Sequence, residues 1–256
     1  MLAGVLGRLR NLGVLAVALL AWWYVSVHVL DKTTRTLLPP PAQILTAAWE
    51  LIQSGDLWRH VRDSVKREFV AFLWASASIP LGIAMGWWKA VEDQVDPLIE
   101  ILRPVPPLAW IPLSILWFGI GDVQNQFIIF LGCFFPILVN TVAAVKGIEP
   151  NLIRAARALG ANEWHVLWRV VLRAALPQIV TGIRVGLGVG WMALVAAELV
   201  GANSGLGFLI SDSRTVLRTD YVIVGMAAIG LIGLAIDSSI RVAARRLLPW
   251  SQELAR

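Results

Sequence analysis

Long apolar runs, separated by short charged connections, constrain this chain more than any other feature. A helix rises about 1.5 Å per residue, so roughly 20 apolar residues cross the hydrocarbon core of a bilayer. Of the 256 residues, 57% are hydrophobic and 15% are charged, and the mean hydropathy is +0.70. This composition excludes an ordinary soluble domain and predicts an all-α integral membrane protein.

Six runs are candidate membrane spans, and together they predict one transmembrane domain over residues 1–256. They cover residues 12–30, 69–88, 104–120, 127–145, 179–200 and 221–240. The third run is the weakest, because its prolines predict a short, kinked helix whose freed backbone groups need partners on neighbouring helices. No small-residue cleavage site follows the first run, which favours an uncleaved span over a signal peptide.

Basic residues predict the orientation of these spans. Six spans place both termini on the same side of the membrane. If that side is the cytoplasm, the inner segments hold 13 Lys and Arg residues and the outer segments hold eight. Cytoplasmic loops carry the excess of basic residues in membrane proteins, so both termini are expected inside. The net charge of +5 has the same origin and does not indicate a nucleic-acid partner.

Two connections have simple interpretations. In the connection 31–68, apolar residues recur at helical spacing between Pro41 and Ser54. This pattern predicts a packed helix along the outer surface rather than a binding site. An acidic cluster after the second span is interpreted as a solvated inner loop; it consists of Glu92, Asp93, Asp96 and Glu100.

The segment 146–177 is polar and rich in arginine although it lies between two spans. Pro150 suits the first turn of a helix, Gly160 its left-handed end, and Asn162 the N-cap of a second helix. The second helix could simply lie on the membrane surface, but small residues at the tip of the first favour docking to another protein. An apolar face of the second helix has a 3.6-residue period: Trp164, Leu167, Trp168, Val171, Leu172 and Ala175.

The fifth span carries a stripe of small residues. Gly182, Gly186 and Gly190 recur every four residues, so another helix can approach closely. That helix could belong to the same chain or to a second subunit. Gly188 and Trp191 lie near the stripe and are candidates to line a pathway.

Charged residues within spans are costly and usually functional. Arg184, near the inner end of the fifth span, can extend its side chain to the membrane surface. Glu198, near the outer end, either faces a pathway or an external partner, or pairs locally. In the sixth span, Asp237 and Arg241 are one helical turn apart and are expected to form an ion pair.

The sequence offers little for catalysis. It lacks the GxxxxGK[ST] pattern of a phosphate-binding loop, so the chain itself is not expected to hydrolyse ATP. The single Cys133 and the scattered His28, His60 and His165 predict no metal site. A membrane-embedded hydrolase has no defined nucleophile here. An ion-coupled secondary carrier is the stronger alternative, but it would need more ionisable groups within the spans.

The segment 146–177 resembles the cytoplasmic EAA loop of ABC importer permeases, written EAA-x3-G-x9-I-x-LP. Arg154 and Arg173 stand where that family usually has Glu and Pro. The residues that match in register are Ala155, Ala156, Gly160, Val170 and Leu172. Three further segments are similar to the nitrate/sulfonate/taurine/bicarbonate permeases: Leu38–Pro41, Arg103–Gly121 and Val195–Ile210. The resemblance covers nearly the whole chain and indicates the family but not the substrate.

This resemblance implies a type I ABC importer permease fold in a bacterial inner membrane. It implies a second permease copy, two cytoplasmic P-loop ATPases that bind ATP and magnesium, and an external solute-binding protein. This chain would then be non-catalytic and hold no cofactor, and it would carry a small anion such as a sulfonate, taurine, nitrate or bicarbonate.

The resemblance also implies roles for particular residues. The helix 150–160 would be the coupling helix that docks on the ATPase, with Trp164 and Trp168 packed beneath it as a stiff lever. Its contact residues would be Arg154, Ala155, Ala156, Arg157, Leu159, Gly160, Ala161 and Trp164. The pathway and subunit interface would include Gly182, Gly186, Gly190, Trp191 and Glu198.

The predicted orientation can be checked with a reporter fused after Arg256. We expect the reporter to be cytoplasmic, because the basic residues place the C-terminus inside. A matched fusion after Ser204, before the sixth span, should report an external location. The reverse pair of signals would contradict the predicted orientation.

Overall fold

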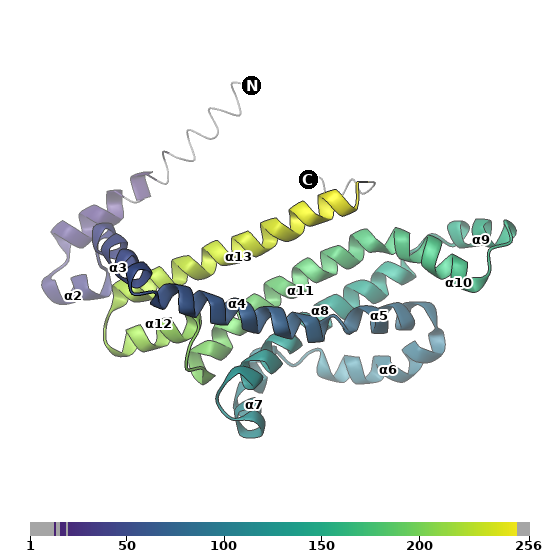
Figure 1. Ribbon diagram of the computed structural model, residues 1–256, viewed down its shortest axis with the longest axis horizontal. Helices are drawn as coiled ribbons and strands as arrows, with labels where there is room; N and C mark the ends of the chain where they lie inside the picture. The colour runs from purple at the N-terminus through teal and green to yellow at the C-terminus, as the bar shows by residue number, and fades with distance from the viewer. Residues whose placement is uncertain (1–12, 14–15, 19, 250–256) are drawn as a thin grey trace.

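The computed structural model of this chain describes residues 13, 16–18 and 20–249, and this described part contains helices and turns but no strand. The prediction of an all-α protein is therefore confirmed. Figure 1 shows an elongated bundle whose longest helices run along its length. α9 (Pro150–Ala158) lies at one end and α12 (Leu206–Thr215) lies near the other, and we call these the α9 end and the α12 end.

Four helical segments are long and apolar enough to cross a membrane, in the positions of predicted spans two, four, five and six. Each begins before the apolar run that predicted it, since the helix continues into polar residues. They are Asp56–Trp87, Asp122–Lys146, Glu163–Gly201 and Thr219–Arg246. The first predicted span, 12–30, lies partly outside the described residues; its described part includes the π-helical turn η1 (Val25–Val29).

The predicted third span, 104–120, is not one helix. α6 (Lys89–Leu102) meets η2 (Pro107–Trp110) and α7 (Ile111–Phe118) at a bend of 78°. The bend falls in the proline-rich sequence, because proline donates no backbone hydrogen bond and disfavours helix at the preceding residue. Counted as one broken span, this pair gives up to five candidate spans in the described part. The acidic cluster expected in a loop lies instead on α6: Glu92, Asp93, Asp96 and Glu100.

The helix predicted in the connection after the first span is α3 (Pro41–Gln53). One side of α3 packs against α12 and α13 (Thr219–Leu247), where Ala47 and Leu51 are buried. Leu45, on the other side, is exposed. The connection is therefore a packed helix, as predicted.

The centre of the bundle is the close contact between α8 (Asp122–Lys146) and α11 (Leu172–Gly201). Gly182, Gly186 and Gly190 of α11 all face α8. Without side chains at these positions, the two helices can approach more closely than helices bearing larger residues.

This contact leaves no room for a side chain at the glycine positions of α11 that face α8. A Cβ atom on Gly186 would lie 2.6 Å from Cγ1 of Ile137 and 2.9 Å from the backbone oxygen of Cys133. Cys133 is buried at this contact. The glycine stripe is thus occupied by α8 of the same chain, so the close approach serves the fold of one subunit rather than the expected interface between two.

α13 is joined to α11 by polar contacts. Trp191 is 7% exposed, and its Nε1 donates to the backbone oxygen of Ile229 at 3.2 Å. The carboxylate of Asp237 accepts a hydrogen bond from Arg241 at 2.7 Å, as predicted, and another from Arg184 at 3.1 Å. Arg184 therefore pairs with a neighbouring helix instead of only extending to the membrane surface.

A buried cluster of charged side chains lies toward the α12 end and centres on Arg67 of α4 (Asp56–Ala75). The guanidinium donates to Glu198 and to Asp122, each at 2.7 Å. It also donates to the backbone oxygen of Ser204 at 2.6 Å. The side chains of Arg67 and Glu198 are only 5% and 0% exposed. The sequence placed Arg67 in an external connection, whereas it lies buried within a helix.

Both carboxylate oxygens of Glu198 are hydrogen-bonded within this cluster. Each accepts from Oγ of Ser64 at 2.9 Å, and Oε2 also accepts from the backbone nitrogen of Gly207 at 2.9 Å. The backbone nitrogen of Gly205 donates to Nδ1 of His60 at 3.0 Å. The cluster thus ties the turn after α11 to α4, and Glu198 pairs within the same chain with residues that are distant in the sequence.

Replacing Gly186 by Ala should destabilise the protein, because the new Cβ atom would press on Ile137 and on the backbone of α8. Overpacking of this kind costs about 1–3 kcal/mol. The matched change Gly188→Ala meets nothing within 4 Å and should be neutral or stabilising, since Ala forms helix better than Gly. The apparent Tm in detergent should fall for Gly186→Ala only, and equal Tm values would contradict the close contact.

Replacing Arg67 by Met should leave the carboxylate of Glu198 buried without its counter-ion. Removing one partner of a buried ion pair costs about 3–5 kcal/mol. The control Arg62→Met changes a side chain that is 77% exposed and should alter stability by less than about 0.5 kcal/mol. Thermal unfolding in detergent measures both, and an unchanged apparent Tm for Arg67→Met would show that the pair does not stabilise the fold.

Candidate functional site

α9 begins and ends as its sequence predicts. Pro150 is its first residue, after Glu149, and Gly160 follows its end with a left-handed φ of +83°. Asn162 then caps the next helix, because its Oδ1 accepts from the backbone nitrogen of His165 at 2.9 Å. Figure 1 shows α9 and this turn at the extremity of the bundle.

The two faces of α9 have different environments. Ile153 and Ala156, together with Ala161, pack on a buried apolar cluster beneath α9. Leu152 is exposed, and Leu159 at the tip is 89% exposed. The apolar side chains of α9 and its turn are therefore divided, with one part packed and one part exposed. Exposed apolar side chains at a protruding tip are candidates to contact another protein.

The second predicted helix is not a separate element. α10 (Glu163–His165), the π-helix η3 (Val166–Val171) and α11 follow one another without a break. Together they form one helical segment, Glu163–Gly201. α9 is therefore attached, through one tight turn, to the extension of a membrane span.

The π-helical segment changes which residues face the core. A π-helix bonds residue i to i+5, so each turn holds more residues than an α-helix, and only part of the predicted stripe is buried: Leu167, Val171 and Ala175. Val166 and Val171 are buried beneath α9, whereas Trp164 and Trp168 are 62% and 61% exposed. The predicted packing of the two tryptophans beneath α9 is wrong. Trp164 instead packs edge to face on Trp88, with ring centroids 6.3 Å apart.

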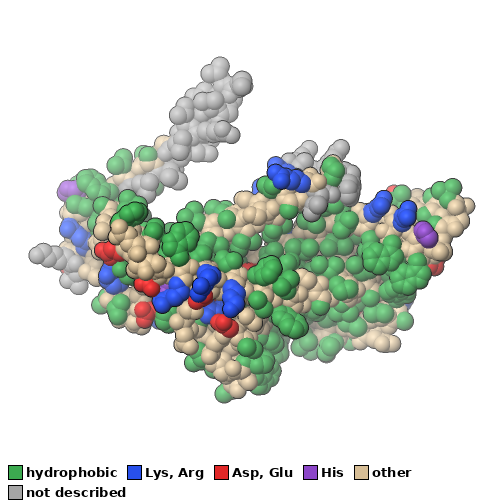
Figure 2. Space-filling view, viewed as in Figure 1, with side chains coloured by type: hydrophobic (Ala, Val, Ile, Leu, Met, Phe, Trp, Pro, Cys, Tyr) green, Lys and Arg blue, Asp and Glu red, His purple; other side chains and the backbone are tan. Residues whose placement is uncertain are grey.

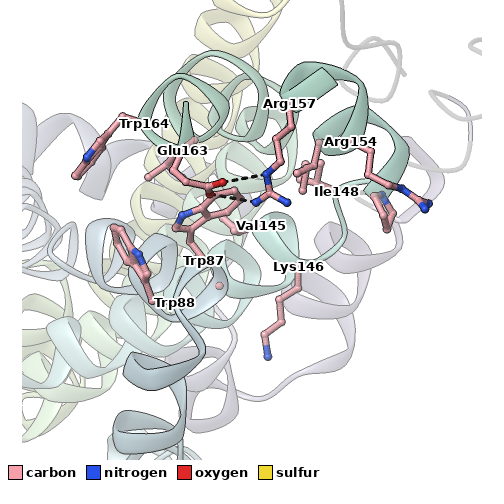
Figure 3. A pocket seen from close by; sticks show the side chains of 13 residues that line it. Trp87, Trp88, Val145, Lys146, Ile148, Arg154, Arg157, Glu163 and Trp164 are labelled. Atoms are coloured by element: carbon pink, nitrogen blue, oxygen red, sulfur yellow. Dashed lines mark hydrogen bonds and ion pairs between the residues drawn. The ribbon is translucent and has the colours of Figure 1, made fainter. Parts of the chain in front are cut away.

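A charged pair bridges α9 and α10. Arg157 donates two hydrogen bonds to the carboxylate of Glu163, at 3.0 and 3.1 Å (Figure 3). Paired bonds of this kind fix orientation more than they stabilise, because exposed ion pairs contribute about 0–1 kcal/mol. Arg154, which stands where the resembling family has Glu, donates to Oδ1 of Asn151 at 2.8 Å and remains exposed.

A groove of about 940 Å³ separates α9 from the ends of α5 (Ser78–Trp87) and α8. Its walls combine aromatic and charged side chains, drawn in Figure 3: Trp87, Trp88, Lys146, Arg154, Arg157, Glu163 and Trp164. Three of these charges are positive and one is negative. Tryptophan beside lysine and arginine is typical of helix ends at the membrane surface.

The residues predicted to contact an ATPase do not all face the same way. Three line the groove: Arg154, Arg157 and Trp164. Three are exposed at the tip: Ala155, Leu159 and Gly160. Two are half-buried: Ala156 and Ala161. The groove residue Trp87 was not anticipated as part of this site, since it belongs to the distant second span; the sequence Trp-Trp-Lys at 87–89 is its local signal.

The residues predicted for a pathway lie elsewhere and are not brought together with α9. They are distributed along α11, where all five are buried against neighbouring helices: Gly182, Gly186, Gly190, Trp191 and Glu198. Within the described ranges, no group of three or more His, Cys, Asp or Glu side chains could hold a metal ion.

The chain is similar to known transport proteins. Residues 78–249 match the family described as binding-protein-dependent transport system inner membrane component. The chain is 43% identical over 250 residues to the taurine transport system permease protein TauC of Escherichia coli (strain K12), covering 95% of this chain and 90% of that protein. It is 32% identical over 224 residues to the nitrate import permease protein NrtB of Leptolyngbya laminosa, covering 83% and 80%.

The fold is also that of a solved structure. A chain from inward-facing conformations of the MetNI methionine ABC transporter matches with a TM-score of 0.59 and 23% identity, over 73% of this chain and 95% of that chain. The expected type I importer permease fold is thereby confirmed. The chain belongs to the binding-protein-dependent transport system inner membrane component family, as a multi-pass permease subunit of an ABC importer.

Proposed function

We propose that two copies of this chain form the translocation pathway of the importer and that α9 is the contact to a separate P-loop ATPase. The observation that carries this proposal is the exposure of Leu159 at the tip of a helix whose other face is packed. Such a tip presents an apolar knob that fits a cleft on a partner. ATP and magnesium would bind to the ATPase, so the free energy of hydrolysis would reach this chain through the contact.

Movement of α9 would reach the membrane through α11. The packing of Ile153 and Ala156 and the Arg157–Glu163 pair hold α9 to the start of a 39-residue helical segment. At 1.5 Å per residue, this segment is about 58 Å long. A displacement of α9 would therefore tilt α11 together with α8, which is packed on its glycines. This continuous path supports a role in coupling.

The proposed orientation places the α9 end in the cytoplasm. The supporting observation is the set of basic and tryptophan side chains around the groove at this end. ATP is cytoplasmic, so a docking helix for an ATPase must lie on that side. The α12 end would then face outward, toward a solute-binding protein.

The proposed solute is a small anion such as taurine, another sulfonate, nitrate or bicarbonate. The names of two relatives support this proposal, since one is a taurine transport permease and the other a nitrate import permease. Their solutes differ in size and shape but share negatively charged oxygen atoms. An external solute-binding protein would make most of the selection among them.

Replacing Leu159 by Asp should weaken the contact with the ATPase. Full burial of a leucine side chain contributes about 1.5–3 kcal/mol, and a carboxylate in the same cleft adds a desolvation cost. We therefore expect about tenfold less ATPase to co-purify with an affinity-tagged permease, together with a loss of ATP-driven uptake.

The matched control for this experiment is Leu217→Asp. Leu217 is 62% exposed and lies between α12 and α13, at the opposite end of the bundle. This variant should retain the ATPase. If Leu159→Asp also retains the ATPase and transports normally, α9 does not make the proposed contact.

A further inference from the structure

Arg103 lies at the bend between α6 and η2, as the last residue before the proline-rich sequence. Its side chain is exposed, and it forms no hydrogen bond or ion pair with the residues that the structure describes. The sequence counted Arg103 among the charges of an inner connection. The structure instead places it part of the way along a broken span.

The Arg103 side chain borders a cavity of about 340 Å³ against the middle of α8. Residues of α8 from Leu131 to Asn140 line this cavity, with Pro107 from the bend and Val189 from α11. α8 is 25 residues long, and this stretch begins about 13 Å from its first residue and ends about 9 Å from its last. A cation at this depth of a span is costly, and by default it indicates a functional site.

The electrostatic character of the cavity favours an anion. Arg103 is the only charged residue among those that line it. A second cavity, of about 700 Å³, shares Arg103 and Val139 with the first but is also lined by Asp96 and Glu100. The first cavity therefore has a net positive charge, and the second has a net negative charge.

We propose that Arg103 and the cavity between the bend, α8 and α11 form a contact site within the membrane for the charged oxygens of the transported anion. This inference rests on the proposed function, because it assumes that the solute is a small anion. The volume of the cavity agrees with a small solute. Ligand pockets generally have volumes of about 300–1,000 Å³, and this cavity is near the lower limit.

The chemistry of the lining suits a sulfonate or a planar oxyanion. The guanidinium group presents paired N–H donors that match two oxygens of such a group. The amide of Asn140 uses one N–H to donate to the backbone oxygen of Pro136 at 2.8 Å, which leaves its second N–H for the anion. Leu131, Phe135 and Val189 supply apolar surface for a short carbon chain.

The second cavity provides a reason why the anion would leave. On α6, Glu100 and Asp96 lie one and two helical turns before Arg103. Both carboxylates border the second cavity, which Arg103 also lines. These carboxylates repel an anion and attract the guanidinium. A pathway needs binding that is weak enough to allow release. Competition of the two carboxylates with the anion for Arg103 would weaken the binding of the anion in this way.

The test measures uptake by the complete importer, reconstituted in proteoliposomes with its ATPase and solute-binding protein. The probes are labelled taurine, ethanesulfonate and nitrate. Arg103→Gln should reduce uptake of the probes that the wild type imports by about tenfold or more, because glutamine lacks both the charge and the paired N–H donors of the guanidinium. Arg103→Lys, which keeps the charge but loses the paired donors, should retain an intermediate rate.

Two further variants separate a role in binding from a role in folding. Val189→Trp fills the cavity and leaves Arg103 intact, and it should reduce uptake to a similar extent. Arg246→Gln removes an exposed arginine of α13 that borders neither cavity, and it should leave uptake unchanged. Co-purification of all subunits checks assembly; if Arg103→Gln fails to assemble, Arg103→Lys and Val189→Trp decide the question.

The outcomes distinguish this inference from the function on which it rests. Reduced uptake in Arg103→Gln and Val189→Trp, with normal uptake in Arg246→Gln, supports the site. Normal uptake in Arg103→Gln, or in Val189→Trp, overturns the site and leaves the proposed function intact. A wild-type importer that takes up none of the three anions would overturn the proposed anion transport and the site together.

Discussion

The close contact between α8 and α11 is the constraint on which the other features of this protein depend. Glycines on α11 bring the two backbones together, and each helix then supplies one carboxylate to Arg67, Asp122 from α8 and Glu198 from α11. Toward the other end, α11 continues into the base of α9, while the last residues of α8 line the groove beside it. Any movement that separates or tilts α8 and α11 therefore changes both the Arg67 cluster and the groove beside α9.

The two ends of the bundle are held by different kinds of interaction. At the α12 end, buried charges and backbone groups satisfy one another through hydrogen bonds of 2.6–3.0 Å. At the α9 end, an open groove lies between the helices, and the ion pairs near it, such as Arg157–Glu163 and Lys146–Glu92, are more exposed than Arg67–Glu198 (Figure 2 shows some of the blue Lys and Arg side chains near this end). Regions with few buried contacts open most readily. The open groove thus leaves more freedom between α9 and the ends of α5 and α8 than between α9 and the apolar cluster beneath it.

Sequence signals that act within one helical turn predicted the structure well, and those that act over longer distances did not. Pro150, Gly160 and Asn162 bound α9 and α10 as expected, because fixed φ, left-handed freedom and capping are local properties. The partner of Glu198 is 131 residues away in the chain, so the sequence indicated that Glu198 needs a partner without indicating Arg67. Periodicity also failed at Trp168, because it assumes regular α-helical bonding where the structure has a π-helix.

The π-helical segment Val166–Val171 also sets the direction in which α9 points around the axis of α11. Successive residues of an α-helix are about 100° apart around that axis. Losing or gaining one residue in this segment would swing α9 by a comparable angle and leave the membrane portion of α11 unaltered. If α9 makes the proposed contact, a single-residue insertion or deletion is thus a short evolutionary route by which one permease fold can be adapted to ATPases of different shape.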